Sequence, residues 1–172
     1  PVRMDKRGVK ERTRAVSGRS REAVTSSLEG NENITFLRGH GRFVGPDAVA
    51  VEGEVLRSKR IFINVGARAA RPDMPGVERV PHLDNSSFLA LDELPAHLIV
   101  VGGSYVGPEF GQMYRRFGSE VTILQRGPRL VPREDEDVSA ALRGILEQEG
   151  VAVRVEAEGT AGGPRGRGIA GR

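Results

Sequence analysis

The period of the hydrophobic positions changes partway along this chain. From residue 97 onward, apolar residues gather in the runs HLIVVGG, SEVTIL and VAVRVEA, with stretches of helical periodicity between them. Short apolar runs are typical of buried strands, and their alternation with helices favours a parallel sheet with crossover connections. We therefore expect a β-α-β-α-β unit over residues 95–157, with helices over 105–117 and 135–150.

Residues 1–94 follow a different pattern. A polar stretch with weak apolar periodicity predicts a helix over 7–28 that ends before Gly30, although Gly18 weakens it. Behind it, ITFL, AVAVEG, EVLRS and RIFINVG are short runs between glycine and proline turns, which predict strands. One short helical turn is expected in NSSFLALDELP. At the other end, the glycine-rich tail 158–172 has few apolar residues, and we expect it to be disordered.

Composition narrows the classes of chemistry. The 172 residues are 38% hydrophobic, enough for one domain or for parts of two. There is no cysteine, which excludes a disulfide or a thiol redox centre on this chain. The longest apolar run, near Leu98 to Val101, is far shorter than the roughly 20 residues that a membrane-spanning helix needs. Three scattered histidines lack metal-ligand spacing. We expect a cytoplasmic protein with no metal site and no membrane partner.

The net charge of +3 comes from arginines that are concentrated in the first 22 residues and in the terminal GPRGRGIAGR. A basic balance is compatible with nucleic-acid binding. However, the chain has no tryptophan and only two tyrosines, so no aromatic platform accompanies the arginines. Solvated arginines explain the pattern better, and a basic nucleic-acid-binding protein stays as an alternative.

A glycine-rich turn follows the strand predicted at residue 97. Gly102, Ser104 and Gly107 occupy the three positions of the Gly-x-Gly-x-x-Gly fingerprint, and Gly103 keeps the turn mobile. The first glycine permits the sharp turn, the second lets the backbone approach a pyrophosphate, and the third lets helix and strand pack closely. Serine is a small replacement, and Pro108 falls early in the helix, where a missing N–H costs little. The alternative is a strand-to-helix turn that binds nothing.

The second strand ends about 20 residues further on, where NAD-binding proteins carry an acidic residue for the ribose. This chain has Gln125 there, followed by Arg126 and Arg129. A missing carboxylate with nearby arginines suits the 2'-phosphate of NADP, so the pattern fits NADP as well as NAD. The alternative is that these two arginines are merely solvated and contact no nucleotide.

The segments RIFINVGARAARPDMPGV, VVGGSYVGPEFGQMYRRFGSEVTIL and RGPRLVPREDEDVSAALRGILEQEGV follow one another in the chain. In this order they resemble the class I pyridine nucleotide-disulfide oxidoreductases, FAD-dependent enzymes that include mercuric reductase and dihydrolipoamide dehydrogenase. The resemblance implies an incomplete Rossmann-like FAD/NAD(P)-binding fold: residues 1–94 are the β-rich later part of the first FAD-binding segment, and residues 95–157 begin the NAD(P)-binding domain.

The same resemblance implies roles for individual residues. Val65, Gly66 and Ala67 match a segment that passes close to FAD. Tyr105 matches a tyrosine that covers the flavin, and Glu109 matches a glutamate that helps to position flavin and nicotinamide for hydride transfer. The plain alternatives are that Tyr105 packs at the helix start and that Glu109 interacts with the helix dipole.

The chain also departs from the family. The 172 residues contain no first FAD fingerprint and no Cys-x4-Cys. Compared with the family, we also expect the C-terminal His-Glu pair and the dimerisation domain to be absent, although the resemblance implies that full-length relatives form homodimers. We therefore expect a fragment of an NAD(P)H oxidoreductase that is inactive alone, with a standalone NAD(P)-binding module as an alternative. The abrupt change to Gly, Arg, Ala and Pro after residue 157 suggests a frameshifted or broken gene.

Overall fold

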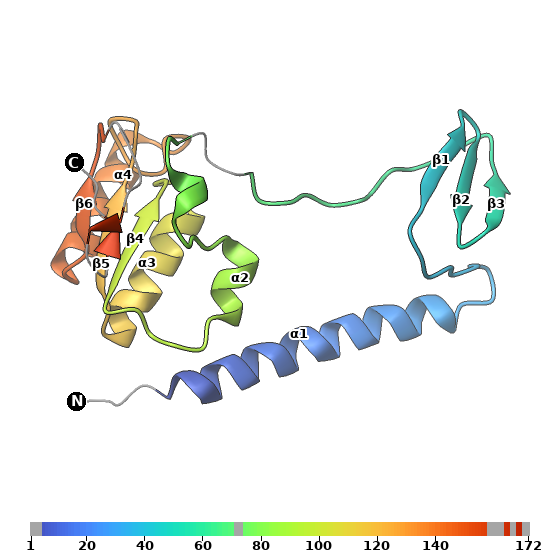
Figure 1. The fold of residues 1–172 in the computed structure, drawn as a ribbon, viewed down its shortest axis with the longest axis horizontal. Coiled ribbons are helices and arrows are strands. Elements are labelled where there is room, and N and C mark those ends of the chain that lie inside the picture. The colour runs from blue at the N-terminus through green and yellow to red at the C-terminus, as the bar shows by residue number, and fades with distance from the viewer. Residues whose placement is uncertain (1–4, 71–73, 158–163, 166–167, 170–172) are drawn as a thin grey trace. The chain divides into compact units, whose positions relative to one another are not determined.

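The structure is a computed structural model that describes residues 5–70, 74–157, 164–165 and 168–169 (Figure 1). The chain divides into two compact units, Glu11–Arg68 and Pro1–Lys10 with Ala69–Arg172, and each is described by itself. The second unit contains residues on both sides of the boundary at 94/95 implied by the family resemblance. That boundary stays a prediction.

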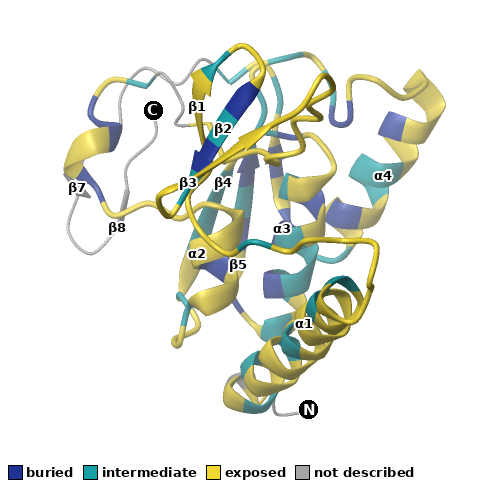
Figure 2. Cartoon of the chain, turned by 90° about the vertical axis from the view of Figure 1, so that its right-hand side faces the viewer, coloured by how far each residue is buried: buried dark blue, intermediate teal, exposed yellow. Residues whose placement is uncertain are grey.

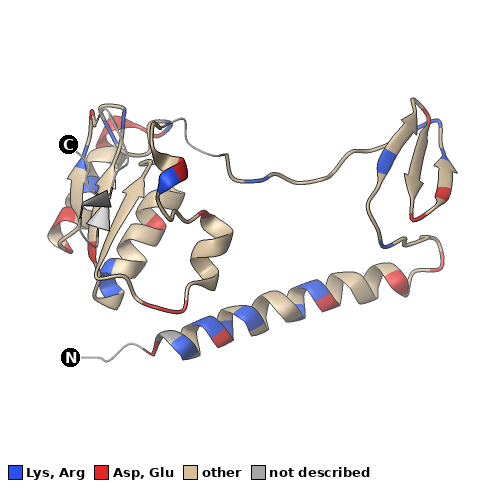
Figure 3. Cartoon of the chain, viewed as in Figure 1, with Lys and Arg blue, Asp and Glu red and all other residues tan. Residues whose placement is uncertain are grey.

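The first helix, α1 (Lys6–Glu29), confirms the expectation for residues 7–28 and continues through Gly18. A Cβ at Gly18 would meet no other atom within 4 Å, so the glycine marks no close contact. Basic and acidic residues are interleaved along α1, as Figure 3 shows, and its side chains are mostly exposed. The helix is therefore a charged surface element.

An antiparallel meander follows α1. Its strands pair in chain order: β1 (Arg42–Gly45), β2 (Ala48–Val51) and β3 (Glu54–Arg57). The β2–β3 turn is Glu52-Gly53, and both residues have positive φ, 46° and 93°, as a tight two-residue hairpin requires.

Two predicted strands of this region are wrong. ITFL (34–37) and RIFINVG (60–66) have no regular secondary structure, whereas β1, which the sequence did not predict, is a strand. A strand forms only where another strand accepts its hydrogen bonds. In the described part of the chain, neither run has such a neighbour, and Phe62 and Val65 are 90% and 89% exposed.

The predicted β-α-β-α-β unit is confirmed. Three parallel strands pair in the order β4 (His97–Val101), β5 (Glu120–Leu124) and β6 (Ala152–Arg154). The crossover helices are α3 (Val106–Phe117) and α4 (Glu136–Gln148). Val101 pairs with Leu124, and Leu124 pairs with Arg154, so the carboxyl ends of the three strands lie at one edge.

Apolar side chains from this sheet and its helices form one core. Figure 2 colours the buried residues of the chain dark blue. Ile123, Leu130 and Leu146 are its largest fully buried residues. Phe88 also joins the core, with its ring centroid 4.3 Å from that of Tyr114. Burial of these side chains is the main stabilising contribution available to the unit.

The remaining elements are short. The predicted helical turn in NSSFLALDELP is α2 (Asn85–Ala90), which begins at a capping box on Asp84. Backbone and side-chain hydrogen bonds from Ser87 lower the pKa of the Asp84 carboxyl. The others are the 3₁₀ helix η1 (Val77–Arg79) and the paired strands β7 (Pro164–Arg165) and β8 (Gly168–Ile169). Most of the tail expected to be disordered lies outside the described residues.

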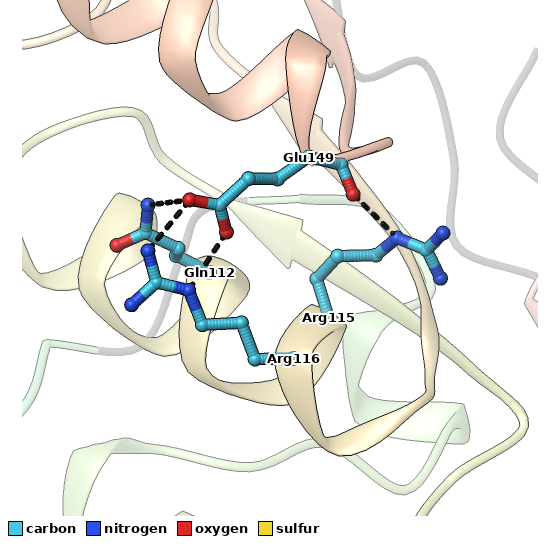
Figure 4. Close-up of polar contacts among 4 residues, drawn as sticks. All are labelled: Gln112, Arg115, Arg116 and Glu149. Carbon is cyan, nitrogen blue, oxygen red and sulfur yellow. Dashed lines mark hydrogen bonds and ion pairs between the residues drawn. The ribbon is translucent and has the colours of Figure 1, made fainter. Parts of the chain in front are cut away.

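Glu149, at the C-terminus of α4, joins that helix to α3 (Figure 4). Its carboxylate accepts hydrogen bonds from Arg116 at 2.6 and 2.8 Å and from Gln112 at 2.9 Å, and its backbone oxygen accepts one from Arg115 Nε at 2.9 Å. The hydrogen bonds from Arg116 lower the pKa of Glu149, and Glu149 raises the pKa of Arg116. The network fixes the two crossover helices together at their C-terminal ends.

We predict that Glu149→Gln lowers stability in a pH-dependent way. Because the folded-state pKa lies below the ordinary value of 4.5, the stabilisation by Glu149 is present above that value and is lost as pH falls through the folded pKa. Urea midpoints should differ most between wild type and variant near pH 7, and the difference should shrink as pH falls below 4.5 through the folded pKa.

Glu147→Gln is the matched control, because Glu147 forms an exposed pair with Arg143 one turn away. We expect it to change the midpoint little at any pH, as is usual for a solvated pair. If the urea midpoints of wild type and Glu149→Gln differed by the same amount at pH 7 and at pH 3.5, the pH-dependent role of Glu149 would be contradicted.

Candidate functional site

The turn between β4 and α3 requires glycine at two of the fingerprint positions. Gly102 has φ +111°, and its N–H donates to the Leu124 carbonyl at 2.8 Å, beside the end of β5. At Gly107, a Cβ would lie 2.1 Å from the Gly102 carbonyl oxygen and 3.2 Å from Val100 Cγ1. The first glycine is required by its backbone conformation and the second by the close approach of α3 to β4.

The expectation that Gly103 keeps the turn mobile is wrong, because Gly103 is fixed by packing and by hydrogen bonds. Gly103 is buried, and a Cβ there would lie 2.6 Å from Leu130 Cδ2 and 3.0 Å from Gln125 Cβ. Val131 N–H donates to the Gly103 carbonyl at 2.7 Å. Leu130 and Val131 therefore support the turn. Both lie outside the Gly-x-Gly-x-x-Gly fingerprint at residues 102–107, so that motif does not predict their role.

Backbone N–H groups at the start of α3 are available to a ligand. Those of Ser104, Tyr105 and Val106 have no acceptor among the described residues. Ser104 is exposed, so its side chain does not fill the turn. Pro108 lies in the first turn of α3, where its missing N–H removes no helical hydrogen bond. Free N–H groups together with the helix dipole favour an anion such as phosphate.

The three residues predicted at the ribose end differ in their contacts. Gln125 Oε1 accepts the N–H of Gly103 at 2.9 Å, so this amide is bonded to the glycine turn. The Arg129 guanidinium pairs with Glu136 at 2.9 Å. Arg126 is exposed, and its guanidinium has no partner in the described part of the chain. Of the two predicted arginines, Arg126 is thus the one whose charge is uncompensated.

Tyr105 and Glu109 lie four residues apart at the start of α3, and the Glu109 N–H donates to the Tyr105 carbonyl at 3.1 Å. Residues at this spacing share one face of a helix. The Tyr105 residue is 60% exposed, and Glu109 is exposed as well. Both side chains are therefore accessible beside the glycine turn.

Val65, Gly66 and Ala67 belong to the unit Glu11–Arg68, whereas the glycine turn belongs to the other unit. They lie in an extended, exposed segment in which Gly66 has φ +70°. Within the described residues, no group of three or more His, Cys, Asp or Glu side chains could hold a metal ion. Among the same residues, no helix has the length and apolar character that crossing a membrane requires.

Comparison with known proteins gives one consistent family. A family model described as pyridine nucleotide-disulphide oxidoreductase matches residues 4–167. Mercuric reductase from Bacillus cereus is 36% identical over 116 residues, which are 67% of this chain and 18% of that protein. The probable pyridine nucleotide-disulfide oxidoreductase RclA from Escherichia coli is 38% identical over 130 residues, 73% of this chain and 30% of RclA.

A solved structure agrees with these matches. The HOCl-induced flavoprotein disulfide reductase RclA from Escherichia coli superimposes with a TM-score of 0.88 at 31% identity, over 97% of this chain and 39% of that chain. The present chain thus spans less than a third of the length of the two curated relatives above, given their covered shares of 18% and 30%.

We predict opposite effects of two glycine-to-alanine substitutions in neighbouring helices. Gly107→Ala forces a methyl group into the Gly102 carbonyl and should destabilise the unit by about 1–3 kcal/mol. Gly144→Ala, at a helix position where a Cβ would meet nothing within 4 Å, is the matched control. It should stabilise by about 0.5–1 kcal/mol, because alanine loses less backbone entropy in a helix.

Urea unfolding followed by circular dichroism measures both changes. If Gly107→Ala were as stable as Gly144→Ala, α3 would not approach β4 as closely as described.

Proposed function

Because the chain belongs to the pyridine nucleotide-disulphide oxidoreductase family, we propose that it is the nicotinamide-dinucleotide-binding part of a flavin-dependent oxidoreductase. The reaction proposed for the whole enzyme is transfer of a hydride from NAD(P)H to FAD. The observation that carries the proposal is the turn between β4 and α3, which lacks side chains at its centre and has free N–H groups beside the end of β5.

The pyrophosphate is the part of the nucleotide that fits this turn. The N–H groups of Ser104, Tyr105 and Val106 supply donors, and the α3 dipole adds partial positive charge. Gly102, Gly103 and Gly107 have no Cβ to hold a phosphate away from the backbone. We assign the two phosphates to this position.

The adenosine end lies at the carboxyl edge of β5. Gln125 presents no charge there, so a 2'-phosphate meets no carboxylate at this position. Arg126 has an exposed guanidinium that could pair with a phosphate through two hydrogen bonds. We assign NADPH as the preferred nucleotide, with Arg126 as the residue that contacts the 2'-phosphate.

Tyr105 and Glu109 are assigned to the nicotinamide side, since both are accessible on the first turn of α3 next to the proposed pyrophosphate position. FAD, when bound, supplies the hydride acceptor. Val65, Gly66 and Ala67 are the residues of this chain that would approach it, and all three are exposed. The role of Glu109 is to hold a negative charge near the nicotinamide and to orient it.

We predict that the 172-residue chain binds NADPH and that Arg126→Ala weakens NADPH about tenfold while changing NADH less than about twofold. Isothermal titration calorimetry with both nucleotides measures the two dissociation constants. Arg143→Ala removes the same charge from the middle of α4, where Arg143 pairs with Glu147, and serves as the control. Equal losses for NADPH and NADH would contradict the role of Arg126, and no binding of either at millimolar concentration would contradict the proposed function.

A second expectation concerns turnover. The chain has no cysteine, so electrons that reach a flavin have no dithiol to reduce on this polypeptide. With FAD and NADPH supplied, the purified chain should not reduce oxidised lipoamide, measured as loss of NADPH absorbance. Turnover in the usual enzyme range of about 1–1000 per second would refute this expectation.

A further inference from the structure

Two buried polar side chains occur among the described residues, Ser119 and Ser139, which are 0% and 3% exposed. The Ser119 hydroxyl donates to the Pro95 carbonyl at 2.6 Å, near the start of β4. The Ser139 hydroxyl donates to the Leu130 carbonyl at 2.7 Å, in the loop between β5 and α4. The two serines make the same kind of bond, but only the second lies beside the glycine turn.

A single peptide group connects Ser139 to that turn. The Leu130 carbonyl, which accepts the Ser139 hydroxyl, and the Val131 N–H, which donates to the Gly103 carbonyl at 2.7 Å, belong to the same peptide plane. A peptide plane is rigid, so fixing its oxygen orients its N–H. The Leu130 side chain also packs on Gly103, as the 2.6 Å approach of its Cδ2 to a hypothetical Cβ shows.

This peptide is held in an unfavourable conformation. Val131 has φ +39°, a region that β-branched residues rarely adopt, and it precedes Pro132, which restricts its backbone further. Such strain persists only where surrounding contacts over-determine it, and it occurs preferentially at functional sites. Here the contacts are the Ser139 hydroxyl and the Gly103 carbonyl.

We propose that Ser139 is a positioning residue for nucleotide binding, because its buried hydroxyl orients the Leu130–Val131 peptide that fixes Gly103. This inference rests on the proposed function, in which the N–H groups of Ser104, Tyr105 and Val106 meet the pyrophosphate. Ser139 does not touch the nucleotide. It acts by holding the turn in the shape that presents those N–H groups.

The test compares Ser139→Ala with Ser119→Ala in the full 172-residue chain. Each substitution removes one buried hydroxyl bond to a backbone carbonyl, so both should lower the urea midpoint by a similar amount. Only Ser139→Ala should weaken NADPH, by about tenfold, when binding is measured by calorimetry under conditions where both variants are folded. Ser139→Thr, which keeps the hydroxyl, should restore affinity to within about threefold of wild type.

Affinity loss of equal size in both alanine variants, or wild-type affinity in Ser139→Ala, would overturn the inference. Hydrogen exchange of a peptide that contains residues 102–106 gives a second readout without ligand. Exchange there should rise in Ser139→Ala and not in Ser119→Ala. If the wild-type chain binds no nucleotide, the proposed function fails, and the exchange comparison still decides whether Ser139 holds the turn: unchanged exchange would overturn it.

Discussion

The carbonyl oxygen of Gly102 occupies the space where a side chain at Gly107 would begin, and the placement of α3 depends on that contact. Without a Cβ at Gly107, α3 lies against β4, and its first turn begins directly at the end of the strand. The free N–H groups of the helix then face the edge where β5 also ends. The proposed anion site lies at this edge, where the carboxyl ends of the parallel strands meet.

The turn does not keep its shape alone. Gly103 receives contacts from Gln125 on one side and from the Leu130–Val131 peptide on the other. Ser139 and the Arg129–Glu136 pair connect that peptide and its loop to α4. The second crossover helix is thus mechanically coupled to the first turn. The Glu149 network adds a separate connection between α3 and α4 at their other ends (Figure 4).

The two units differ in how far they bury their apolar side chains. The parallel sheet has a continuous core, whereas the meander buries chiefly Ala48 and Ala50. Phe62 and Val65 in its extended segment are almost fully exposed, so they contribute little apolar burial to this unit. The proposed nucleotide site is built from residues of the parallel unit, and the chain spans only part of its relatives.

Sequence alone determined the β-α-β-α-β unit, because short apolar runs, helical periodicity and the glycines at 102 and 107 are local signals. The strands predicted from sequence at residues 34–37 and 60–66 are wrong, since an apolar run becomes a strand only when another strand pairs with it. Tertiary structure alone decided that Gln125 bonds to the turn and that Ser139 supports it. Gln125 and Gly103 lie 22 positions apart in the chain. Ser139 bonds to Leu130, 9 positions away, and reaches Gly103 only through the Val131 N–H, so no local pattern encodes either contact.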